Sequence, residues 1–170
     1  HGGLQASGSH QGDIMLSMVG SVSFSGGSAA DSYAQLGHGG VSAEGDHSGA
    51  LTLMNTGDLA FTGGTAGDTY AQLGHGGGNA VGNHSGTILL SQVGNLIFIA
   101  STGTESVAQL GHGGNDADGT QTGNISIVVA ENITFIAGTG SSGASAQLGH
   151  GGDASDDSGN ITATASGDIR

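Results

Sequence analysis

Histidine is the side chain of this sequence best suited to metal binding or acid–base chemistry, and most of its copies lie in one repeated motif. The heptapeptide AQLGHGG occurs at 34–40, 71–77, 108–114 and 146–152, and a truncated copy stands at 1–3. Alternation along an extended chain places Ala34, Leu36 and His38 on one face, so the motif histidines should point inward near a corner. The motif supplies no carboxylate or second histidine that a metal would need beside them. We therefore expect a buried, hydrogen-bonded ladder of imidazoles formed by His38, His75, His112 and His150.

Three further histidines follow the motif at a constant distance. His10, His47 and His84 each precede a glycine by two residues, in what we expect to be a long loop, and Gln121 takes their place in the next repeat. A metal site in this loop is one interpretation, because imidazole is a common zinc ligand. The glutamine indicates that a ligand is not required in every repeat, which favours an ordinary loop position.

Acidic side chains also recur in register. Asp31, Asp68 and Glu105 occupy one loop position in successive repeats, and unit charges about 5 Å apart repel by roughly 0.8 kcal/mol even in water. Either the loops spread and leave a solvated acidic flank, or a cation lies between the carboxylates. Calcium prefers oxygen ligands. This row is therefore the candidate calcium site, and calcium is the one cofactor that the sequence suggests.

The composition argues against catalysis and against several kinds of partner. The chain has 14 acidic residues, one basic residue (Arg170), no cysteine and a net charge of −13. Carbohydrate-cleaving β-helices need carboxylates clustered in one cleft, whereas the acids here follow the repeat. Nucleic acids and anionic membranes are bound through Lys and Arg, and no apolar run is long enough to span a bilayer. We expect a non-enzyme with no nucleic-acid partner and no direct membrane insertion.

Strands are the elements that must position these residues. The motif histidines His38, His75 and His112 are 37 residues apart, and each repeat holds three stretches in which apolar residues alternate with small or polar ones. Gly-Asp or Gly-Asn pairs mark several of the corners between stretches. The first stretch begins at Ile14, Leu51, Ile88, Ile125 and Ile161. Inward positions of the other two give two ladders, Phe24, Phe61, Phe98 and Phe135, and Leu36, Leu73, Leu110 and Leu148.

Strands one repeat apart can pair in parallel. The sequence therefore predicts an all-β fold, a parallel β-solenoid (β-helix) with about one three-stranded coil per 37-residue repeat. The alternative winding has two coils of roughly 18 and 19 residues per repeat, but the half that contains AQLGHGG has only one apolar stretch, too few for three sides.

The array should fill 1–170 as one domain, with repeats at 12–48, 49–85, 86–122 and 123–158 between partial repeats at 1–11 and 159–170. We expect it to be a segment of a longer polypeptide, because it starts without methionine inside a motif and stops inside another repeat.

Segments 57–61, 94–98 and 123–127, in which Gly-Asp or Gly-Asn precedes alternating apolar residues, resemble the repeats of filamentous-haemagglutinin-like exoproteins. These are long secreted β-helices of Gram-negative bacteria, commonly exported by two-partner secretion. AQLGHGG and the loop after it depart from the shorter repeats of that family.

The resemblance implies a non-catalytic structural role, as the rod or shaft of a bacterial surface adhesin or extracellular filament. Such a protein is secreted or displayed on the cell surface, and it associates with itself through its ends or sides or with a host ligand that the sequence does not name. The alternatives are a segment of a carbohydrate-processing β-helix whose catalytic coils lie elsewhere, and a calcium-dependent ligand-binding repeat.

Overall fold

The chain folds as a parallel β-solenoid. A computed structural model describes residues 2–55, 57–129, 131–151 and 154–170, and this part is all β, without a helix. It therefore contains no helix long and apolar enough to cross a membrane. Phe61 pairs in parallel with Phe24 on one side and with Phe98 on the other. This register confirms the prediction of one coil per 37-residue repeat.

The described strands form four sheets. The first sheet contains β1 (His10–Gln11), β5 (His47–Ser48), β9 (His84–Ser85), β13 (Asp118–Thr122) and β17 (Ala154–Ser158). The second contains β2 (Ile14–Met18), β6 (Leu51–Asn55), β10 (Ile88–Val93), β14 (Ile125–Val129) and β18 (Ile161–Ala165). The third contains β3 (Val22–Ser25), β7 (Leu59–Thr62), β11 (Leu96–Ile99) and β15 (Ile133–Ile136). The fourth contains β4 (Tyr33–Leu36), β8 (Tyr70–Leu73), β12 (Val107–Leu110) and β16 (Ser145–Leu148).

The second, third and fourth sheets correspond to the three stretches expected from the sequence, and they enclose the main core. Their inward residues stack in ladders, among them Leu53, Phe61 and Leu73, which are fully buried. The period of two arises because successive side chains of a strand point to opposite faces. Each Leu or Phe buried in this way stabilises the fold by about 1.5–3 kcal/mol.

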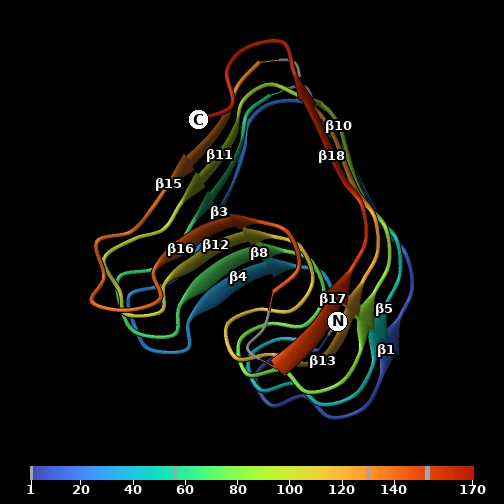
Figure 1. Cartoon of the computed structure of the whole chain (residues 1–170), viewed down its shortest axis with the longest axis vertical. Helices are drawn as coiled ribbons and strands as arrows, with labels where there is room; N and C mark the ends of the chain where they lie inside the picture. The colour runs from blue at the N-terminus through green and yellow to red at the C-terminus, as the bar shows by residue number, and fades with distance from the viewer. Residues whose placement is uncertain (1, 56, 130, 152–153) are drawn as a thin grey trace.

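The first sheet was not expected, because its strands β1, β5 and β9 are only two residues long. It belongs to a second compartment of each coil, which we call the lobe: residues 38–49, 75–86 and 112–123 in the three coils where it is described without a gap. In Figure 1 the chain leaves the fourth sheet, turns back beneath it and returns through the first sheet to the second. The fourth sheet thus lies between the main core and the lobe.

Burial on both faces of the fourth sheet follows from this arrangement. All four residues of β8 and of β12 are buried. Ala71 and Leu73 face the main core, whereas Tyr70 packs with Tyr33, Val107 and, from the lobe, Val41. The lobe therefore covers a sheet face that would otherwise meet water.

Apart from a β-bulge between Ser91 and Val93 in β10, the register of the described strands changes where the repeat length changes. Val107 pairs with Ser145, which is one residue more than the usual spacing, and Asp118 pairs with Ala154, which is one residue less. The extra residue lies in the loop between β15 and β16, and the interval from Gly151 to Ala154 is two residues shorter than the equivalent interval from Gly113 to Asp118. Loops absorb both changes, so the ladders of the core stay aligned.

Candidate functional site

The AQLGHGG segment forms the end of the fourth sheet and the corner into the lobe. Gly76 has a φ of +94°, a conformation that side chains other than glycine rarely adopt. A β-carbon added at Gly74 would lie 1.8 Å from the carbonyl oxygen of Gly111 in the next coil. Glycine is therefore needed here so that successive coils can approach one another, and this close stacking places the motif histidines in a column.

The motif histidines form a continuous stack, which we call the corner column: His38, His75, His112 and His150. Their ring centroids are 4.8–4.9 Å apart and their planes are within 4° of parallel. His38, His75 and His112 have no exposed surface. The structure thus places all four side chains in one ladder at the corner, with their two ring nitrogens facing different partners.

The imidazoles of His75, His112 and His150 each join two neighbouring segments of backbone. The Nδ1 atom of His75 accepts a hydrogen bond from the backbone N–H of His38 at 3.0 Å, and its Nε2 atom lies 3.0 Å from the carbonyl oxygen of Gly49. A backbone N–H can only donate and a carbonyl can only accept, so Nε2 carries the proton and the ring is neutral. The equivalent Nε2 atoms of His38, His112 and His150 lie 2.8–3.0 Å from the carbonyls of Gly12, Gly86 and Gly123.

These bonds close the lobe at its neck, because His75 begins one lobe and Gly49 ends the lobe of the preceding coil. A second proton on Nδ1 would face a donor instead of an acceptor. Burial of the ring lowers the pKa of His75 to about 4 and that of His112 to about 3, and neighbouring histidines contribute to both decreases. His75 and His112 are thus neutral structural imidazoles at physiological pH.

Glutamines form a second polar ladder on the lobe side of the fourth sheet. The Nε2 atom of Gln35 donates to the carbonyls of Gly74 and Gly76 in the next coil, at 3.0 and 2.9 Å. Gln72 makes the equivalent bonds to Gly111 and Gly113. These amides bind glycine carbonyls of the corner, and the carbonyl of Gly76 also accepts from the backbone N–H of Gly40. The sequence did not indicate this role.

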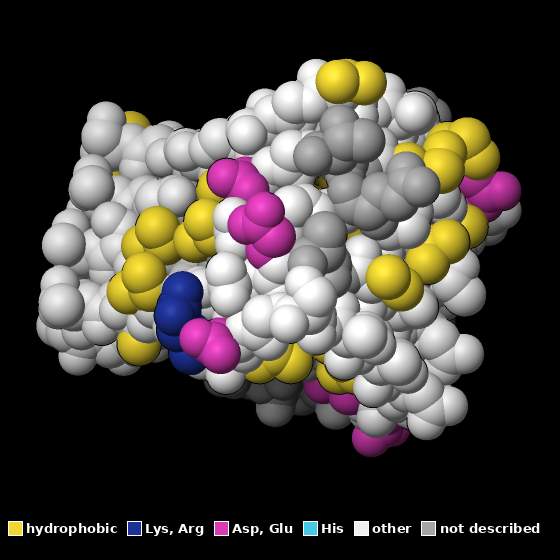
Figure 2. Space-filling view, turned by 90° about the horizontal axis from the view of Figure 1, so that it is seen from above, with side chains coloured by type: hydrophobic (Ala, Val, Ile, Leu, Met, Phe, Trp, Pro, Cys, Tyr) yellow, Lys and Arg dark blue, Asp and Glu magenta, His cyan; other side chains and the backbone are white. Residues whose placement is uncertain are grey.

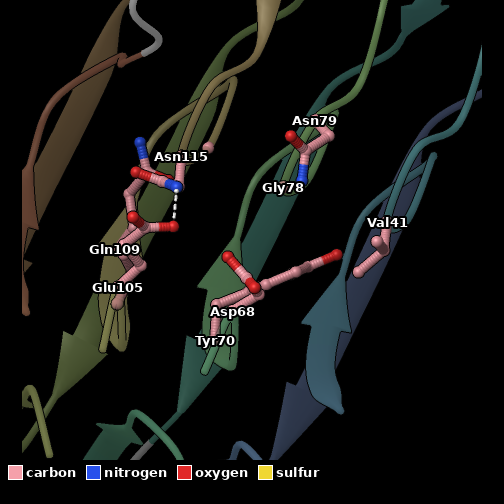
Figure 3. A pocket seen from close by; sticks show the side chains of 10 residues that line it. Val41, Asp68, Tyr70, Gly78, Asn79, Glu105, Gln109 and Asn115 are labelled. Carbon is pink, nitrogen blue, oxygen red and sulfur yellow. Dashed lines mark hydrogen bonds between the residues drawn. The ribbon is translucent and has the colours of Figure 1, made fainter. Parts of the chain in front are cut away.

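The acidic row lies in the loops between the third and fourth sheets. Asp31, Asp68 and Glu105 each have φ between +55° and +57°, so they occupy equivalent left-handed positions in three coils. Interaction with the Asp68 carboxyl is the main cause that raises the pKa of Glu105, and Asn115, whose Nδ2 atom donates to Glu105 at 3.0 Å, opposes it. Figure 3 shows this bond from the Asn115 amide to Glu105.

The row borders a crevice between the fourth sheet and the lobe. Val41, Tyr70 and Val107 line it together with Asp68, Glu105 and Asn115. In Figure 3 the phenol of Tyr70 points toward Val41 and away from Glu105. Its hydroxyl therefore lies apart from the Asp68–Glu105 pair, and the two kinds of group do not converge on one position. Burial raises the pKa of Tyr70 far above its usual value.

Within 2–55, 57–129, 131–151 and 154–170, no group of three or more His, Cys, Asp or Glu side chains is placed to hold a metal ion. The sequence suggested a loop position for a second set of histidines, but the structure places them in strands: His10 in β1, His47 in β5 and His84 in β9. His47 and His84 are fully buried. The expectation of a loop position was wrong because the lobe folds back and covers these residues.

A ladder of amides and carboxylates between the second and third sheets was also missed. The Oδ1 atom of Asp58 accepts from the backbone N–H of Asn95 at 2.8 Å, and the Oδ1 atom of Asn95 accepts from the Nδ2 atom of Asn132 at 3.0 Å. The backbone bond from Asn95 is the main cause that lowers the pKa of Asp58. The Asp or Asn after glycine at this corner was the available signal.

No protein-family model matches the chain, and searches of curated proteins and of solved structures find no significant match. The geometry itself indicates the chemistry of these side chains. Histidine, glutamine, asparagine and aspartate mainly bridge one coil to the next, as the bonds of His75, Gln35 and Asp58 illustrate.

Proposed function

We propose that this chain is the shaft of a bacterial surface adhesin or extracellular filament, related in kind to the filamentous-haemagglutinin-like exoproteins. The observation that carries the proposal is the unbroken stacking of like residues from coil to coil. The rings of Phe24, Phe61, Phe98 and Phe135 follow one another at 5.0–5.3 Å, within 10° of parallel. An array in which each repeat contacts only its neighbours is a stiff rod whose length is set by the number of repeats.

The distribution of charge supports a role in which rods associate side by side. No strand of the second or third sheet contains a charged residue. Their outward residues include Met15, Leu89, Val128 and Ile136, all substantially exposed. Figure 2 shows hydrophobic side chains on either side of a band of acidic ones. Two copies that each carry a net charge of −13 would repel least if they met through these uncharged faces.

The proposal is tested by removing whole coils from the full-length protein displayed on its native cell. Deletion of 49–85 should shorten the shaft by about 4.8 Å, the spacing of paired strands, while surface display and attachment to the target persist. Shaft length is measured by electron microscopy and attachment by a cell-adhesion assay. The matched control deletes 49–66, about half a coil, which should destroy the register. Loss of attachment on deletion of one whole coil, with the rod intact, would instead assign a ligand-binding role to that coil.

A further inference from the structure

The histidines of the first sheet form a second column, which we call the lobe column: His10, His47 and His84, continued by Gln121. The ring centroids of successive histidines are 5.2 Å apart and their planes are 12–16° from parallel. The Nδ1 atom of His84 lies 2.8 Å from the Oε1 atom of Gln121. Gln121 therefore fits into the column as a histidine does, without the possibility of gaining a charge.

The lobe column differs from the corner column in its hydrogen bonding. Neither ring nitrogen of His47 has a hydrogen-bond partner, and the same holds for Nε2 of His84 and Nδ1 of His10. A buried polar atom without a partner costs free energy, and a buried charge without a partner costs more. The lobe column is therefore held in place mainly by packing and stacking, and its polar neighbours, the backbone of Gly45 beside His47 and Gln121 beside His84, offset the burial of a charge only in part.

The surroundings of the column oppose a positive charge from several sides. Within the column, His47 faces His10 and His84, and from the corner column it faces His38. Electrostatic repulsion from His84 likewise contributes to the lowered pKa values of His75 and His112 in the corner column. The one contact that would favour a charge on His84 besides Gln121 is the carboxylate of Asp46 in the lobe. Burial is the main cause that lowers the pKa of His47 to about 4, and the backbone of Gly45 opposes it only partly.

We propose that the lobe column is an acid-sensitive latch: protonation of its buried imidazoles, His47 and His84, opens the lobe while the main core of the solenoid stays folded. Opening gives the charged rings access to water, which the closed lobe denies them. The core has no corresponding reason to open, since its ladders of Leu, Ile and Phe contain no titratable group.

The two tyrosines of the chain give a local signal for this event. Tyr33 and Tyr70 stack on the lobe side of the fourth sheet, with centroids 4.9 Å apart, and pack with Val41 of the lobe. Tryptophan is absent, so tyrosine fluorescence reports the state of the lobe, while far-ultraviolet circular dichroism reports the strands of the whole solenoid.

The experiment measures quenching of tyrosine fluorescence by acrylamide, a neutral probe, between about pH 7.5 and about pH 5, a range in which free histidine titrates and most carboxylates do not. In the parent chain the quenching constant should rise at least about twofold at the lower pH, as expected for local opening, with an unchanged dichroism spectrum. In a variant with His10→Gln, His47→Gln and His84→Gln, which retains the corner column, the quenching constant should rise clearly less than in the parent. The reverse substitution, Gln121→His, extends the column and should move the opening to higher pH.

Two results would overturn the proposal. An equal rise of quenching in the parent and in the triple glutamine variant would assign the opening to other groups. Loss of dichroism in step with the tyrosine signal would show that the whole solenoid unfolds instead of the lobe alone. If the triple variant does not fold at neutral pH, the single change His47→Gln replaces it, because Gln121 already occupies the same position of another coil.

Discussion

The aromatic ring of Phe24 lies parallel to that of Phe61, with 5.2 Å between their centroids and 6° between their planes. This separation is close to the spacing of two paired strands. A winding with two coils per repeat would place another coil between the rings and would roughly double the distance. The pair therefore establishes that one repeat makes one complete coil, and that a phenylalanine ladder runs through the core.

Deletion of one whole repeat should leave a folded, shorter rod. Residues 49–85 form one coil, and their removal joins Ser48 to Gly86. Ser48 pairs in register with Ser85, so after the deletion it takes the place of Ser85 before Gly86. All ladders stay aligned, so the variant should retain a cooperative thermal transition and a β-type dichroism spectrum. Removal of 49–66 alone should abolish both, because it deletes β6 and β7 and leaves that coil without a strand in the second and third sheets.

The core ladders could be predicted from the sequence because their signal is simple. Phe61 and Leu73 alternate with smaller or polar neighbours, and the identical pattern returns one repeat later. A strand whose twin lies one repeat away has one obvious partner. Periodicity alone was therefore enough to predict the parallel pairing, the register and the inward faces of three of the four sheets.

The lobe could not be predicted in the same way. Its strands are two residues long in three coils, too short for any period to appear, and its buried residues include His47 and His84, which are polar. Their burial depends on how the chain folds back over the fourth sheet, a tertiary relationship with no local pattern. The recurrence of His10, His47 and His84 was visible, but nothing in it distinguished a buried strand from a loop.

Alanine at Gly74 should destabilise the solenoid far more than alanine at Gly67. An added β-carbon at Gly74 would lie 1.8 Å from the carbonyl oxygen of Gly111, whereas at Gly67 its nearest neighbour, the carbonyl oxygen of Thr104, is 3.9 Å away. We expect Gly74→Ala to lower the free energy of unfolding by more than about 3 kcal/mol and Gly67→Ala to change it by less than about 1 kcal/mol. Urea denaturation of the two variants measures both values, and equal effects would contradict the tight packing of the corner.

Removal of calcium should leave the stability of this segment unchanged. The carboxylates of the acidic row do not converge with a third ligand within the described chain, and Asn115 donates to Glu105, as it would to a solvated carboxylate. The melting temperature should therefore be the same with and without a chelator. A decrease with chelator that disappears when Asp31, Asp68 and Glu105 are all changed to asparagine would establish the calcium row instead.

The substitution Asp68→Asn tests the electrostatic interaction between Asp68 and Glu105 in the same row. The Asp68 carboxyl raises the pKa of Glu105, so its replacement should lower that pKa toward the usual range for glutamate. Because both side chains are only partly buried, the effect on stability should be less than about 1 kcal/mol. Titration of the Glu105 side-chain carbon by NMR measures the pKa, and an unchanged value would show that the two loops are farther apart in solution.

Acid should destabilise the whole solenoid through the corner column. Burial lowers the pKa of His75 to about 4 and that of His112 to about 3, whereas in the unfolded chain both return to about 6.5. Between these values the unfolded chain binds more protons than the folded one, so stability falls as the pH decreases. The stability contributed by the neutral rings is fully present above about pH 6.5 and is lost progressively toward pH 4.

The expected loss is about 2 kcal/mol for each of the two histidines at pH 5, since one pKa unit corresponds to 1.36 kcal/mol. It is measured as the difference in the free energy of urea unfolding between about pH 7.5 and about pH 5. The parent is compared with a variant that carries His75→Gln and His112→Gln, in which the lobe column and all carboxylates are retained. The variant should lose about 4 kcal/mol less than the parent over this range. Equal losses in the two proteins, or imidazole titrations near 6.5 by NMR, would mean that these rings are accessible to protons in the native state and that the corner column does not close the neck of the lobe.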